Sequence, residues 1–236
     1  MTNAELVAYH GNPALKASVL AEMAEHRAAD ALVKGVYWEN GRGCAVGCLT
    51  HDPWGGHAQY PVRWGIPEEL AWLEDSIFEN LPSGLAWVWP ERFLAAIPTG
   101  ADLSGVYAAW SAALMLDPER GNITRCGGYP LAEAAIRVVG ELWRDTHTAS
   151  RQAWAAASGQ AWAARRQAES ADEWEAASAA ESAADSAEWL AASISRSISW
   201  AAGSAADSTN DAPAHWQWMA DRLIECLTKA PVVVAS

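Results

Sequence analysis

The feature that most constrains the fold is the tract at residues 149–208, which consists mainly of Ala, Ser, Trp and acidic residues. Alanine has the highest helix propensity, and its small side chain lets helices approach closely, so the tract is predicted to be helical and not disordered. Its tryptophans are Trp154, Trp162, Trp174, Trp189 and Trp200. On one straight helix they would spread over much of the circumference. We therefore predict several helices, broken near Gly159 and Gly203, in preference to one long coiled coil.

The rest of the chain carries start and stop signals for further helices. Asn12 can cap a helix that begins at Pro13, and we expect this helix to reach about Lys34, just before Gly35. The other predicted helices cover residues 67–81, 90–97, 102–116, a stretch beginning at 130, and 215–229. The fold prediction is an all-α multi-helix bundle. We expect a single domain over residues 1–236, with an N-terminal part at 1–148 and an Ala-rich part at 149–236.

Charge and hydropathy narrow the classes of partner. The chain of 236 residues is 51% apolar, enough for a substantial core, and its formal net charge is −13. Long nucleic acid is not expected as a partner, because phosphate binding needs clustered Lys and Arg. A small ligand or a basic protein fits the charge better, and homo-oligomerisation is left open. The fifteen tryptophans offer large flat faces that suit either helix packing or stacking on a ligand ring.

The sequence predicts a cytoplasmic protein, which would be the host cytoplasm if the protein is viral. No window approaches the roughly 18 unbroken apolar residues of a membrane span, and the N-terminus lacks a basic and then apolar signal pattern. The four cysteines form no dense disulfide pattern, which agrees with a reducing compartment.

Candidate chemistry is concentrated in residues 36–57, VYWENGRGCAVGCLTHDPWGGH, where Cys, His, Trp and Gly occur together. Asn40-Gly41 is a strong hairpin signal, so a small β-hairpin is one interpretation. The other, which we slightly favour, is a tight loop that places Cys44 at the start of a short helix ending at His51. There the helix dipole would lower the pKa of the thiol.

Two enzymatic interpretations follow from this segment. In a helix, Cys44, Cys48 and His51 would share one face, and with His57 they could form a tetrahedral zinc site, although the spacing matches no standard zinc finger. Alternatively, Cys44 is a nucleophile that His51 or His57 activates, with Glu39 or Asn40 as the orienting group. A separate orienting pair, His26 and Asp30, would lie on one face of the first helix.

The simplest interpretation is structural: small Cys and Gly side chains let the loop pack tightly, and the histidines are ordinary polar residues. Among the functional interpretations we favour a third, in which this region is a recognition surface for a nucleotide-like small molecule. Tryptophans provide stacking faces, arginines provide forked donors, and glycine amides can hold an anionic group. The predicted ligand-binding residues are Trp38, Glu39, Asn40, Arg42, Gly43, Cys44, His51, Trp54, Arg63 and Trp64. We expect no catalytic residue, no cofactor and no resident metal.

Two parts of the chain resemble known groups of proteins. The segments HRAADALVKGVYWENGRGCAVGC, GIPEELAWLEDSIFENLP and WPERFLAAI resemble a group of uncharacterised phage and prophage proteins. This resemblance implies a viral or mobile-element setting and no particular chemistry. The segments AWAAASGQAWAARRQAES and WQWMADRLIECLTKAP are similar to the alanine-rich half of an immunity protein family from polymorphic toxin systems. That resemblance implies a helical, non-catalytic protein and transfers no binding residue.

Three functions are therefore compared. The leading hypothesis is a non-catalytic phage or prophage counter-defence protein that sequesters a nucleotide-type immune signal of the host. The second is an immunity-type protein that masks a basic toxin with its acidic surface. The third is a thiol or zinc enzyme centred on Cys44.

Overall fold

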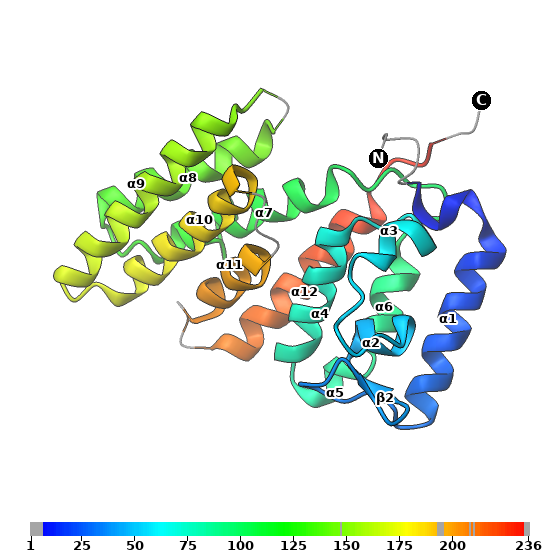
Figure 1. Cartoon of the computed structure of the whole chain (residues 1–236). Helices are drawn as coiled ribbons and strands as arrows, with labels where there is room; N and C mark the ends of the chain where they lie inside the picture. The colour runs from blue at the N-terminus through cyan, green and yellow to red at the C-terminus, as the bar shows by residue number, and fades with distance from the viewer. Residues whose placement is uncertain (1–6, 147, 193–195, 208, 210, 234–236) are drawn as a thin grey trace. The chain divides into compact units, whose positions relative to one another are not determined.

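The computed structural model describes residues 7–146, 148–192, 196–207, 209 and 211–233, with side chains described outside 189–200 and 207. It is mostly helical, at 69%, with one small antiparallel hairpin, which confirms the all-α prediction and the hairpin near Asn40-Gly41 (Figure 1). The side chains of Trp189 and Trp200 lie outside the described residues. No described helix has both the length and the apolar character needed to cross a membrane.

Contacts divide the chain into two compact units, Met1–Tyr107 with Ala220–Ser236, and Ala108–Met219. The second unit thus includes residues 108–148, which the sequence analysis had grouped with the N-terminal part. The single domain remains a prediction. The first unit contains η2 (Ala8–Gly11), α1 (Pro13–Ala28), β1 (Trp38–Glu39), β2 (Arg42–Gly43), α2 (Ala45–Thr50), α3 (Gln59–Trp64), α4 (Glu68–Asn80), α5 (Ser83–Ala86) and α6 (Trp89–Ala96).

In the first unit, α1 packs against α2 and α6, and α4 packs against α2, α3, α5 and α6. Leu70, Leu73 and Ile77 of α4 are buried and form its core-facing side. The short helix α2 is buried from Ala45 to Leu49, so it lies inside this unit although it has only six residues. Residues on α2 and on the hairpin beside it are therefore placed by tertiary packing.

The first helix is shorter than predicted. The Asn12 side chain accepts hydrogen bonds from the backbone of Ala14 and Leu15, as expected for a cap, but α1 ends at Ala28. Asp30 adopts a left-handed backbone conformation with φ of 50°. The following backbone instead pairs with β2, because Gly43 donates to Ala31 O and Val33 donates to Gly43 O. Strand-like pairing has replaced two further helical turns.

In the second unit, α10 packs against α8, α9 and α11 (Figure 1). The elements of this unit are α7 (Val106–Leu116), η3 (Asn122–Arg125), α8 (Pro130–Arg144), α9 (Arg151–Ser170), α10 (Trp174–Ala192), α11 (Arg196–Asp207) and α12 (Ala212–Thr228), with the division between units falling inside α7 and α12. Several Ala-rich helices are present, as predicted. The predicted breaks are wrong, because Gly159 lies inside α9 and Gly203 lies inside α11.

The helix predicted from Asp102 begins later, at Val106. Asp102 instead belongs to a small extended arrangement, in which its backbone N donates to Pro231 O and the residue bridges to Val7. Ala101 forms a second antiparallel bridge with Val232. The apolar end of the chain, up to Val233, therefore pairs with the segment before α7.

Candidate functional site

Residues 36–57 contain both predicted structures, the β-hairpin and the short helix with Cys44 at its start. β1 and β2 pair around a turn in which Asn40 and Gly41 have φ of 52° and 80°, the left-handed values that a type I′ hairpin turn needs. Directly after β2, Cys44 caps α2, and its Sγ accepts a hydrogen bond from the Gly47 backbone at 3.4 Å. The tight turn and the Cys44 cap together place the hairpin against α2.

Glycine at two positions makes this close packing feasible. A Cβ added at Gly43 would lie 1.9 Å from the carbonyl oxygen of Tyr37, and one added at Gly47 would lie 1.5 Å from the same atom. Real side chains do not approach a backbone oxygen so closely. Both glycines therefore serve the packing of the Tyr37 backbone on α2.

The environment of Cys44 does not favour a nucleophilic thiolate. The residue is 1% exposed, and burial, followed by the nearby carboxylate of Asp75, raises the pKa of the Cys44 thiol. The sequence analysis expected the opposite shift from the start of a helix. With only six residues, α2 supplies a weak dipole, and desolvation outweighs it.

The four residues suggested for zinc separate into different surroundings. Cys44 lies with Asp75 and Glu79, and Cys48 donates to the backbone oxygens of Ala31 and Gly43. His57 interacts with Asp75, and His51 with His26. Within the described part of the chain, no group of converging metal-binding atoms contains more than one of the four.

His57 belongs to a buried polar cluster. Its Nε2 lies 3.2 Å from Asp75 Oδ2, and its ring stacks on Trp72 with centroids 3.6 Å apart. Glu74, the residue before Asp75 on α4, accepts a hydrogen bond from the Tyr60 hydroxyl at 2.7 Å. Burial raises the pKa of the Glu74 carboxyl to about 8, and the Tyr60 hydroxyl opposes part of this shift. The cluster therefore attaches the loop that follows α2 to the helix α4.

The predicted ligand-binding residues also divide into groups. Trp64 is buried with its ring edge-on to Tyr60, while the Arg63 guanidinium lies over the Trp64 ring and donates to Leu49 O at 2.6 Å. These two residues therefore hold α3 to α2. Gly43 and Cys44 are buried as well. Trp54 is 89% exposed in the loop between α2 and α3.

Two of the remaining predicted residues, Trp38 and His51, lie together with His26, which the sequence suggested only as a partner of Asp30. Trp38 stacks on His51, with ring centroids 4.3 Å apart and planes at 28°. His26 lies edge-on to both rings, with centroids 5.6 Å from Trp38 and 5.4 Å from His51. Arg42 on β2 donates two hydrogen bonds to Asp30 O, at 2.9 and 3.2 Å. We call Trp38, His26 and His51 the Trp38 surface; Glu39, Asn40 and Arg42 are exposed on the hairpin.

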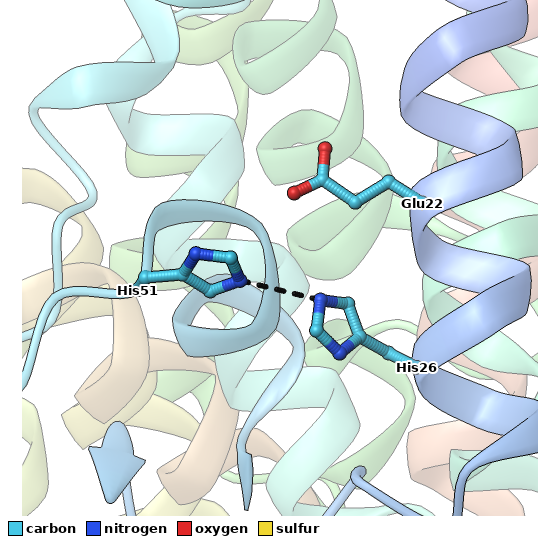
Figure 2. Close-up of side chains that lie close together, drawn as sticks. All are labelled: Glu22, His26 and His51. Atoms are coloured by element: carbon cyan, nitrogen blue, oxygen red, sulfur yellow. Dashed lines mark hydrogen bonds between the residues drawn. The ribbon is translucent and has the colours of Figure 1, made fainter. Parts of the chain in front are cut away.

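Figure 2 shows that the two histidines meet through their Nε2 atoms, which are 3.3 Å apart. Glu22 lies one turn before His26 on α1, and its carboxylate lies within 4.8 Å of both ring nitrogens. Burial, and then His51, lower the pKa of His26, whereas Glu22 opposes the shift. These three residues could hold a metal ion.

The partner predicted for His26 is wrong. Asp30 lies beyond the end of α1, so the two residues are not one turn apart on a helix. The relevant spacing is Glu22 to His26, also four residues, which the sequence analysis did not consider. The contact between His26 and His51 could not be predicted from sequence spacing, because the two histidines belong to different elements.

A groove of about 860 Å³ lies elsewhere, along the outer face of α8 and the residues after it. Its lining includes Val138 and Leu142, flanked by the Glu133–Arg137 ion pair. None of the described residues that line this groove has an aromatic side chain, so these residues offer no stacking face for a nucleotide base. It contains none of the predicted site residues.

The chain matches no protein-family model, no curated protein and no solved structure.

Proposed function

We propose that the protein is a non-catalytic phage or prophage counter-defence protein that binds and sequesters a small nucleotide-type immune signal at the Trp38 surface. The viral setting rests on the resemblance of the N-terminal segments to phage and prophage proteins. The binding role rests on the stacked pair of Trp38 and His51, which is the observation that carries the proposal.

The pair provides a pre-organised platform for an aromatic base. Trp38 is half-buried, and contact with two histidine rings fixes the orientation of its indole. A side chain that is already ordered loses little conformational entropy when a ligand binds. Stacking of a base on an aromatic side chain contributes about 1–3 kcal/mol and tolerates different bases.

Arg42 adds a cation to the same hairpin, on the strand that pairs with that of Trp38 and in register with Glu39. Asp30 O holds its guanidinium through Nε and Nη2, and the side chain is exposed. A planar guanidinium in a fixed position suits a phosphate oxygen better than a mobile lysine would. The burial of Cys44 counts against a thiol enzyme centred on this residue, because its raised pKa disfavours the thiolate that such an enzyme needs.

Calorimetric titration tests the proposal, using the full chain and a panel of cyclic dinucleotides, cyclic trinucleotides and nucleoside diphosphates. We expect one panel member to bind, and Trp38→Ala to weaken its affinity by at least roughly 10-fold. Trp174→Ala is the matched control, because Trp174 is an exposed tryptophan of the second unit. Binding of no panel member, or equal affinity in both variants, would contradict the proposal.

A protein partner is the second candidate, and the exposure of Trp54 favours it. A tryptophan that is 89% exposed is a common anchor in protein interfaces, and the net charge of −13 suits a basic partner such as a toxin. We expect such a complex to weaken with salt and with Trp54→Ala, while Trp38→Ala leaves it unchanged. The reverse ranking would exclude this candidate.

A further inference from the structure

We propose that Glu22, His26 and His51 bind a divalent transition-metal ion, best suited to zinc, and leave a fourth coordination position open. The site differs from the zinc set suggested by the sequence, with which it shares His51. It does not depend on the nucleotide-binding role proposed above.

The distances between the donor atoms fit a tetrahedral ion. The Nε2 atoms of His26 and His51 are 3.3 Å apart. Two nitrogens that each bind zinc at about 2.0–2.1 Å with tetrahedral geometry lie about 3.3 Å from one another. One carboxylate oxygen of Glu22 lies within 4.8 Å of both nitrogens, so a modest side-chain rotation would complete a three-ligand set (Figure 2).

The scaffold holds these side chains close together. Glu22 and His26 are one turn apart on α1, a helix of sixteen residues, so they project from the same face. His51 ends α2 in a left-handed conformation with φ of 54°, and its backbone N donates to Gly47 O. Trp38 stacks on the His51 ring and also lies edge-on to His26.

The surroundings of His26 match those of a metal-binding histidine. The backbone of Cys48 lies close enough to the His26 ring to raise the pKa of this histidine against the lowering by burial. Histidine ligands commonly use one ring nitrogen for the metal and donate from the other to a backbone carbonyl or a carboxylate. A direct hydrogen bond between the two histidines would also explain the 3.3 Å separation of their Nε2 atoms. It would not explain why the carboxylate of Glu22 lies close to both rings.

A second convergent group, Cys44, Asp75 and Glu79, is a weaker candidate. Both carboxylate oxygens of Glu79 accept hydrogen bonds from the Gly35 backbone, at 2.9 and 3.0 Å, and Asp75 Oδ2 interacts with His57. The donors of that group already serve protein contacts. Those of Glu22, His26 and His51 lie at the surface, where an ion can enter.

Two histidines and one carboxylate leave tetrahedral zinc with one position for water or another ligand. Because this position lies beside Trp38, the ion would also supply positive charge to a phosphate in a strongly acidic protein. That additional role, unlike the metal site itself, rests on the proposed function.

The test is a metal titration of the untagged full chain after chelator treatment, without any nucleotide. We expect one Zn²⁺ per chain by calorimetry, and Co²⁺ to give the strong visible absorption of tetrahedral coordination. His26→Ala, His51→Ala and Glu22→Gln should each weaken Zn²⁺ affinity by at least roughly 10-fold. The matched controls are Glu25→Gln, on the same helix, and His10→Ala, an exposed histidine outside the site; both should bind as the wild type does.

Thermal melts with and without Zn²⁺ keep the test decisive if a variant is less stable. An ion that binds the folded protein raises the Tm of the wild type, and it should not raise that of His51→Ala. Failure of the wild type to bind Zn²⁺ or Co²⁺, or equal affinity in the wild type and the ligand variants, would overturn the proposal. Neither result depends on whether nucleotides bind.

Discussion

At the scale of single residues, the site depends on how closely backbones approach near α2. Gly47 is buried beneath the Tyr37 carbonyl, and this contact places the hairpin that carries Trp38. Trp54, by contrast, contributes little to the core, because most of its side chain is exposed. Neighbouring positions of one short segment therefore differ sharply in their tolerance of change.

Gly47→Ala should destabilise the protein by roughly 3 kcal/mol, because the new Cβ meets a backbone oxygen that cannot move without shifting the hairpin. The free energy of unfolding from urea titration measures the effect. Gly84→Ala is the control, since a Cβ there meets no atom within 4 Å. Equal stability of the two variants would show that the packing around Tyr37 differs from the structure.

At the scale of elements, the Ala-rich helices show how glycine can be neutral or essential within the same kind of structure. Gly159 is exposed inside α9, and a Cβ there would meet open space. Gly140 is buried inside α8, where a Cβ would lie 2.4–2.7 Å from three atoms of the Leu116 side chain. The effect of a Cβ on stability therefore depends on helix propensity at Gly159 and on helix packing at Gly140.

Gly159→Ala should therefore stabilise the protein by about 0.5–1 kcal/mol, which is the difference in helix propensity between the two residues. Gly140→Ala should destabilise it, because Leu116 must leave its present position. Thermal denaturation followed by circular dichroism compares the two variants with the wild type. A loss of Tm in Gly159→Ala would indicate that α9 is interrupted near this residue.

At the scale of the whole molecule, buried carboxyls in both units link stability to pH. Burial raises the pKa of Glu74 in the first unit to about 8. Burial, followed by Glu181 and with partial opposition from Ser204, raises the pKa of Asp185 in the second unit to about 7. Both pKa values are higher than those of the same carboxyls in the unfolded chain. The folded protein therefore binds more protons than the unfolded chain at pH values between the unfolded and the folded pKa.

The contribution of these two carboxyls to stability should consequently fall as pH rises toward the folded pKa values. Buried His215, whose pKa burial lowers to about 3, acts in the opposite direction below about pH 6.5. For Glu74 alone the free energy of unfolding should fall by roughly 3 kcal/mol between about pH 5 and pH 8. Urea titrations across this range should show a flatter profile for Glu74→Gln and for Asp185→Asn. The exposed substitution Glu119→Gln should keep the wild-type slope. A wild-type profile without any slope would contradict the burial of these carboxyls.

Local sequence by itself determined the helical class, several helix starts and the hairpin. Asn12-Pro13, Asn40-Gly41 and the Ala-rich composition act through neighbouring backbone, so their effects can be read without knowing the fold. Each of these predictions agrees with the structure. The predicted breaks at Gly159 and Gly203 are wrong because the helix-propensity cost of one glycine, about 1 kcal/mol, is too small to end either of these Ala-rich helices.

Tertiary structure alone decided where α1 ends and which side chains meet at the Trp38 surface. Residues 31–33 leave the helix because Gly43, brought close by the hairpin, offers them backbone hydrogen bonds. His26 meets His51, and not Asp30, for a related reason: the two histidines lie on α1 and at the end of α2, and these helices pack together. Such contacts join residues distant in sequence, and the free energy that selects them arises from burial and backbone pairing across the whole unit.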